Sequence, residues 1–256
     1  MEQEGWLTDH RKFQGDERLK NRLVFQRRSD MRCIYCGERA ETREHCPSKM
    51  LVSGLEDVNL PVLPACHACN NSFSADELYT KYYIQYLEEW NNNTLPALVA
   101  SDETIKREAH DDADAFINTK GLNASDRVKR ILAKIAKGHV VYELSEIMDA
   151  NSGWSTIDIR YSVKRMMDEY QWKRLIEPVP LNHRSFPEIG SRQYTEIIIV
   201  EHPSGADVAE GNAYLDWIDI QPEIYSYIAF FDSDHEIVVR IIIRDCIWAS
   251  VRFKEG

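Results

Sequence analysis

Two Cys-x-x-Cys pairs, Cys33–Cys36 and Cys66–Cys69, place the strongest constraint on how this chain can fold. Each pair forms a tight turn that directs two thiolates to one point, and two such turns complete the tetrahedral four-sulfur set that zinc prefers. Four unrelated buried thiols would rarely fall at this spacing. Because four cysteines close the coordination shell, we expect a structural zinc ion that stabilises a segment too short to fold alone.

Composition and charge narrow the class of protein. The chain has 256 residues, and no apolar run approaches the roughly 18 residues that a membrane span needs. The N-terminal residues are charged from Glu2 onward and contain no apolar signal region, so we expect a cytoplasmic protein with no membrane partner. In that reducing compartment, cysteines favour metal ligation over disulfides. The net charge of -11 excludes nonspecific coating of nucleic acid but is compatible with a local basic site.

Residue periodicity predicts an α+β chain. Ser74 and Glu77 fit a capping box at the start of one long helix, and a second helix is expected from Ser125, with Gly138 as its stop. Further along the chain, alternating and β-branched runs favour strands, of which the last three have the spacing of an antiparallel meander. The expected strands are 157–161, 194–200, 224–231, 236–243 and 246–253.

The segment between the cysteine pairs carries the polar residues that point to chemistry. Glu44 and His45 follow the first pair, Asn59 precedes the second, and Asn70 comes directly after the last cysteine. This order resembles the HNH endonuclease family. Its zinc-ribbon members read Cys-x-x-Cys, an acidic residue followed by His and soon by Pro, then Asn-Leu, then Cys-x-x-Cys followed by His or Asn. The resemblance covers residues 33–80.

The resemblance implies a fold and a role for each of these residues. The fold is a ββα-metal hairpin clamped by the zinc ion, with a helix that starts near Asn70. Glu44 and Asn70 would bind a catalytic divalent cation, Mg²⁺ or Mn²⁺. His45 would be the general base that activates water for attack on phosphorus, and Asn59 would orient its ring. The implied activity is endonucleolytic hydrolysis of nucleic acid, with DNA favoured over RNA because most of the family cuts DNA.

Three departures from the usual family pattern lie in the same segment. Glu44 stands where Asp is commoner and is a longer ligand, and Asn70 stands where His is commoner. The Lys that many relatives carry shortly after the last cysteine is missing here. Other basic residues are therefore expected to contact phosphates. These candidates are Arg39, Arg43, Lys49, Arg27 and Arg28, the last two in a basic segment, 16–28, that looks helical.

Several alternatives remain open at the level of single residues. His67 lies inside the second cysteine pair and could be a ligand, although an outward-facing side chain is favoured. Asn71 could take the role of Asn70. The acidic group at 110–114 is interpreted as a solvated helix face rather than a metal site. Cys46, which follows the proposed base, is interpreted as a small buried apolar group.

We therefore expect two domains. Residues 1–120 would form an HNH nuclease domain with its zinc-ribbon core at 33–80, and residues 121–256 an α+β domain that recognises substrate, effector or partner, including a second copy of the chain. The first rival is a non-catalytic zinc-ribbon module that binds nucleic acid or protein. The second rival is an interaction protein in which residues 121–256 carry the function, because sequence alone assigns them no chemistry.

Overall fold

The structure is a computed structural model that describes residues 32–52, 60–94, 104–146, 148–180, 195–200, 210–233 and 235–256. For 195–200 and 210–213 it describes the backbone alone. Three of the predicted site residues lie outside the described residues, as does the basic segment expected to be helical. These are Asn59, Arg27, Arg28 and the segment 16–28.

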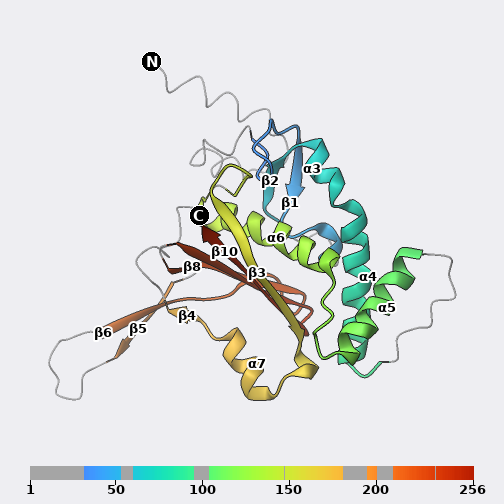
Figure 1. Ribbon diagram of the computed structural model, residues 1–256. Coiled ribbons are helices and arrows are strands. Elements are labelled where there is room, and N and C mark those ends of the chain that lie inside the picture. The colour runs from blue at the N-terminus through green and yellow to red at the C-terminus, as the bar shows by residue number, and fades with distance from the viewer. Residues whose placement is uncertain are drawn as a thin grey trace.

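Helices packed against antiparallel sheets make up the described part of the chain, which confirms the predicted α+β architecture (Figure 1). None of the helices in the described ranges is long and apolar enough to cross a membrane. The elements that precede the large sheet are β1 (Thr42–His45), η2 (Lys49–Leu51), β2 (Val62–Ala65), α3 (His67–Ser72), α4 (Ser74–Asn91), α5 (Thr104–Asn118) and α6 (Asp126–Leu144).

Strands β1 and β2 form an antiparallel hairpin in which Thr42 lies opposite Ala65 and His45 lies opposite Val62. Helix α3 follows β2 directly, and α4 continues the chain with Phe73 as its N-cap and without a side-chain capping hydrogen bond. The predicted capping box of α4 is therefore wrong.

The large sheet has the strand order β3-β10-β9-β8-β7, and its described pairings are antiparallel. The predicted meander corresponds to β8, β9 and β10 and is confirmed. A smaller antiparallel sheet has the order β4-β6-β5. The elements after α6 are β3 (Trp154–Val163), η3 (Lys164–Met166), α7 (Glu169–Ile176), β4 (Val179–Pro180), β5 (Thr195–Val200), β6 (Glu210–Leu215), β7 (Ile218–Gln221), β8 (Tyr225–Ser233), β9 (Glu236–Ile243) and β10 (Ile247–Glu255).

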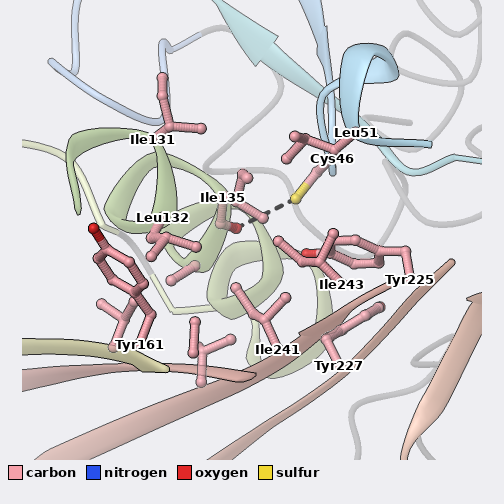
Figure 2. Close-up of a cluster of buried hydrophobic side chains, with 14 of the residues drawn as sticks. Cys46, Leu51, Ile131, Leu132, Ile135, Tyr161, Tyr225, Tyr227, Ile241 and Ile243 are labelled. Carbon is pink, nitrogen blue, oxygen red and sulfur yellow. Dashed lines mark hydrogen bonds between the residues drawn. The ribbon is translucent and has the colours of Figure 1, made fainter. Parts of the chain in front are cut away.

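Helix α6 lies between the hairpin and the large sheet, and the main hydrophobic core surrounds it (Figures 1 and 2). Its side chains Leu132 and Ile135 are buried together with Tyr227 and Ile241 of the sheet. The same cluster contains residues from both sides of position 120, from Ile34 to Phe253. The alternate residues of β8 belong to a second, smaller cluster, so this strand is buried on both faces.

A chain of buried polar contacts joins the hairpin to the sheet through α6. The Cys46 thiol, which directly follows β1, donates a hydrogen bond to the carbonyl of Ile135 at 3.3 Å (Figure 2). The sulfur also lies 3.6 Å from Nδ1 of His139, whose Nε2 is 2.8 Å from the hydroxyl of Tyr225. Cys46 is 3% exposed, as predicted for a small buried group, and these contacts fix the end of β1 against the helix.

Helix α6 continues through Gly138 to Leu144, so the prediction that Gly138 ends this helix is wrong. The helix ends where Ser145 adopts the left-handed conformation. Gly138 instead lies where α6 passes the hairpin: a Cβ atom there would be 2.6 Å from Sγ of Cys46 and 3.1 Å from Cδ1 of Leu63. Glycine is required at this position because the two elements approach closely.

Replacing Gly138 by Val is expected to lower the free energy of unfolding by about 1–3 kcal/mol, because the added methyl groups overpack this contact. Chemical denaturation checks this. Ala133→Val, at a partly exposed position of α6, is the control, because it shows how much a Val side chain changes the stability of the helix without overpacking. Cys46→Ala in the same chain should recover part of the loss, whereas an equal cost at both positions would argue against a close approach.

Candidate functional site

The four cysteines predicted to bind zinc lie together at the base of the hairpin. Cys33 and Cys36 belong to the turn that precedes β1, and the chain reverses there at Gly37, which has a φ of 77°. Cys66 is the N-cap of α3, and Cys69 lies in the first turn of that helix. The four sulfur atoms are within 4.8 Å of one another, so this group could hold a metal ion.

The geometry of the cluster fits zinc. A tetrahedral site with Zn–S bonds of about 2.3 Å has sulfur–sulfur distances of about 3.8 Å, and Sγ of Cys36 is 3.7 Å from Sγ of Cys66. The cysteines are not joined by disulfides. Burial raises the pKa of the Cys36 and Cys69 thiols, whereas the backbone N–H of Cys69 lowers the pKa of Cys66. Four thiolates need a cation between them, which zinc would supply.

Glu44 and His45 are neighbours on β1, and the alternation of a strand directs their side chains to opposite faces. Glu44 is buried, and its Oε1 accepts a hydrogen bond from Nζ of Lys134 at 2.9 Å. The same ammonium also pairs with Glu77 of α4. Burial raises the pKa of Glu44, and Lys134 opposes that shift. No capping box forms on α4, because its N-cap is Phe73 and not Ser74, and the side chain of Glu77 is directed to Lys134.

His45 lies at the end of β1 and is partly exposed. Burial lowers its pKa, and the positive charges of Lys49 and Arg43 lower it further. Its imidazole is therefore neutral at neutral pH, and a neutral imidazole can accept a proton.

Asn70 lies in α3 and ties that helix to β1. Its Nδ2 donates to Oγ1 of Thr42 at 3.3 Å and to the carbonyl of Arg43 at 3.4 Å. Asn70 is thus beside the strand that carries Glu44 and His45, although the carboxylate of Glu44 is directed to Lys134. Among the described residues, one group of three or more His, Cys, Asp or Glu side chains is close enough together to hold a metal ion, and that group is the cysteine cluster.

The basic residues near the hairpin are on the surface. Arg39, Arg43 and Lys49 are exposed, and Arg39 forms an isolated antiparallel bridge with Arg32. His67 is also exposed and is not among the four ligands grouped in the cluster, as expected for an outward-facing side chain.

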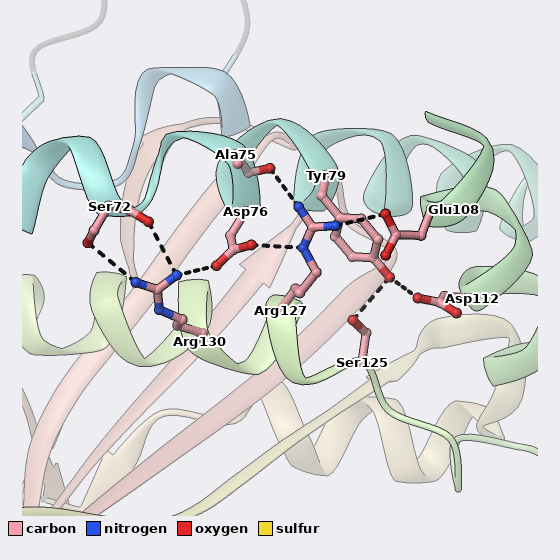
Figure 3. Close-up of polar contacts among 9 residues, drawn as sticks. All are labelled: Ser72, Ala75, Asp76, Tyr79, Glu108, Asp112, Ser125, Arg127 and Arg130. Atoms are coloured by element: carbon pink, nitrogen blue, oxygen red, sulfur yellow. Dashed lines mark hydrogen bonds and ion pairs between the residues drawn. The ribbon is translucent and has the colours of Figure 1, made fainter. Parts of the chain in front are cut away.

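Helix α6 contributes residues that sequence reasoning missed. On the face it turns to α4, Arg127 pairs with Asp76 at 2.8 Å and with Glu108 at 3.0 Å, and Arg130 also pairs with Asp76 (Figure 3). One turn further on, Lys134 reaches the hairpin. The spacing of three cations on one helix face was readable in the sequence, but it did not reveal which acidic residues they meet.

The acidic group at 110–114 lies on α5. Asp111, Asp112 and Asp114 are exposed, and Asp112 accepts a hydrogen bond from the hydroxyl of Tyr79 in α4 (Figure 3). Tyr86 of α4 likewise donates to Asp114 at 3.3 Å. The acidic group is therefore a solvated helix face, as interpreted from the sequence, and two of its carboxylates also accept hydrogen bonds from tyrosines of the neighbouring helix.

Searches against protein-family models, curated proteins and solved structures find no match to this chain. Its function must therefore be inferred from the site itself.

Proposed function

We propose that this protein is a metal-dependent, HNH-type endonuclease that hydrolyses phosphodiester bonds, with DNA as the favoured substrate and His45 as the general base. The observation that supports it most is the arrangement of β1, β2 and α3 around the four-cysteine cluster. The side chain of Asn70 in α3 contacts β1 at Arg43, immediately before Glu44 and His45. This brings the helix that carries one proposed metal ligand to the strand that carries the other.

Phosphodiester hydrolysis needs an activated water molecule and a counter-charge for the anion that develops at phosphorus. The side chain of His45 is on the opposite face of β1 from that of Glu44, so its neutral imidazole would have to turn toward the cation to take the proton from that water. Glu44 and Asn70 would hold the divalent cation through oxygen atoms, with waters completing its shell. When bound, the cation would polarise the phosphate and stabilise the leaving oxygen. The exposed Arg43 and Lys49 would contact neighbouring phosphates.

One observation favours a second function. The ion pair with Lys134 already satisfies the buried carboxylate of Glu44 within the protein. A chain in which this pair is purely structural would be a zinc-ribbon module that binds nucleic acid or protein without cleaving it.

Substitution of the proposed base tests the first function. His45→Ala is expected to lower nicking of supercoiled plasmid by about 10²- to 10⁴-fold, which is the usual contribution of a general base, and to leave the zinc content unchanged. Plasmid and single-stranded RNA are digested with Mg²⁺, with Mn²⁺ and with EDTA. His67→Ala is the matched control, because His67 is an exposed histidine on the same module that has no proposed role.

Two results would contradict the proposal. The first is full nicking by His45→Ala, which would identify a contaminating nuclease or a different base. The second is an absence of cleavage by the wild type in every metal, and retained binding of nucleic acid in that case would support the second function.

A further inference from the structure

We propose that the large sheet carries a binding site for a phosphate group, formed by Arg240, Ser250 and Trp248 on its outer face, which is the face turned away from α6. These residues belong to β9 and β10, in the half of the chain to which the sequence assigns no chemistry. The inference does not depend on the proposed function, because the hairpin lies on the other side of α6 (Figure 1).

Strand alternation places the three side chains on one face of the sheet. The odd-numbered residues of 247–253 in β10 belong to the main core around α6, so Trp248 and Ser250 are directed to the outer face. Arg240 lies directly opposite Ser250 on β9. Side chains that are paired in this way share a face, and their Cβ atoms are about 4.5–5.5 Å apart. The smaller hydrophobic cluster, which includes Phe230 of β8, lies on the same face.

Arg240 is a partly buried cation that forms no ion pair with a carboxylate in the described part of the chain. Its guanidinium carbon lies 5.3 Å from the centre of the Phe230 ring. A ring contacts the flat side of a guanidinium group, whereas the N–H donors point outward from its edge. Burial lowers the pKa of Arg240; Asp232 opposes that shift, but Arg252, to which Asp232 is bound, adds to it. Because buried arginines are normally paired, an anion would supply the missing partner.

Trp248 provides a second, independent donor. Its indole Nε1 is buried and has no hydrogen-bond partner among the described residues, although the N–H of a buried tryptophan usually has one. Ser250, two residues further along the strand, is 8% exposed and carries a hydroxyl group that can also donate. Guanidinium and indole nitrogens donate hydrogen bonds and do not accept them. The group therefore favours a ligand whose polar atoms are acceptors.

Phosphate fits these donors better than a carboxylate does. Donors from three side chains need an anion with at least three acceptor oxygens, and a carboxylate has two. The planar guanidinium of Arg240 can form two parallel hydrogen bonds to a phosphate. On β3, Arg160 lies opposite Ser250 from the other side and adds positive charge. Its Nε already donates to Asp158 at 2.6 Å, so we assign the direct contact to Arg240.

The test follows the indole N–H resonance of Trp248 by nuclear magnetic resonance. The full-length protein is titrated at constant ionic strength with inorganic phosphate, with adenosine 5′-monophosphate and with acetate, and Trp248→Phe assigns the resonance. Both phosphate probes are expected to shift it, and acetate is expected to bind more weakly. A higher affinity for the nucleotide than for inorganic phosphate identifies a nucleotide as the source of the phosphate group, and equal affinities identify free phosphate.

Variants locate the site. Arg240→Met is expected to raise the Kd for phosphate by about 10- to 100-fold, because a hydrogen-bonded charge is lost, and Ser250→Ala by about 2- to 10-fold. Arg240→Lys keeps the charge without the paired donors and should lie between the wild type and Arg240→Met. Arg107→Met, which removes an exposed arginine from α5, is the matched control and should leave the Kd unchanged.

The thermal midpoint separates a binding role from a structural one. Because Arg240 has no ion pair to lose in the described part of the chain, Arg240→Met should fold with an unchanged or higher thermal midpoint while phosphate binding weakens. If Arg240→Met does not fold, Arg240→Lys and Ser250→Ala carry the test. The inference is overturned if neither phosphate probe shifts the Trp248 resonance, if Arg240→Met binds phosphate as tightly as the wild type, or if acetate binds as tightly as phosphate.

Discussion

Removal of the metal ion that the cysteine cluster could hold, which we expect to be zinc, is expected to unfold the hairpin and the start of the helical segment that follows it. Strands β1 and β2 have four residues each, and α3 has six. The buried residues beside the cysteines form only a small cluster, in which Ala65 is the one buried residue that is not a cysteine, whereas the more distant Ile34 and Leu63 belong to the main core. Structural zinc supplies an apparent free energy of about 10–16 kcal/mol in zinc-finger peptides, which is more than this cluster can replace.

A high-affinity chelator and the variant Cys69→Ser both test this expectation. Each should remove the zinc, lower the thermal midpoint and expose the backbone amides of β1 and β2 to hydrogen exchange. Cys246→Ser is the control, because Cys246 is buried in the sheet region and is not a member of the cluster. Retention of zinc and of the native thermal midpoint by Cys69→Ser would contradict a structural role for the metal.

A fragment of residues 1–100 is expected to bind zinc without forming a stable folded module. Helix α4 buries Tyr79, Tyr83 and Leu87 in a core to which α5 and α6, later in the chain, contribute most of its neighbours. The hydroxyl of Tyr83, for example, is 3.0 Å from that of Tyr161 in β3. Burial of one such large side chain contributes about 1.5–3 kcal/mol, and the fragment would expose all three. It would also leave Glu44 without Lys134.

Zinc content, circular dichroism and urea denaturation of the fragment are the measurements. We expect zinc to be bound, but with a broad transition of low cooperativity and with no nicking activity. Addition of residues 101–256 in trans should restore part of the cooperative transition. A fragment that unfolds as cooperatively as the whole chain and nicks DNA would instead support the separate nuclease domain that the sequence suggests for residues 1–120.

The sequence predicted those parts of the structure that depend on residues close together in the chain. The cysteine cluster was predictable because two Cys-x-x-Cys turns direct their sulfurs by backbone geometry alone. The helix that begins after Ser125 and the strands of the meander were predictable because alternation and periodicity report which side of an element is buried. Helix α7 also carries a local signal, the capping box of Asp168 and Gln171, which the sequence reasoning did not use.

Features decided by contacts between distant segments were not predictable. Ser74 and Glu77 have the spacing of a capping box, but the carboxylate of Glu77 finds a buried ammonium far along the chain. Glycine often ends a helix, but Gly138 lies within α6 because the side chain of Cys46 on the hairpin leaves no room for a Cβ atom there. In both cases one sequence window contains only one of the two partners, so tertiary structure overrides the local preference.

The ion pair between Glu44 and Lys134 joins residues 90 positions apart in the chain. Loss of the ammonium at Lys134 would leave the buried carboxylate of Glu44 without the charge that compensates it, so a substitution at position 134 is expected to need a second one at position 44. A gene segment that encoded the cysteine hairpin alone would carry only one of them. Transplanting that segment into another protein would therefore leave the carboxylate of Glu44 buried without its ammonium.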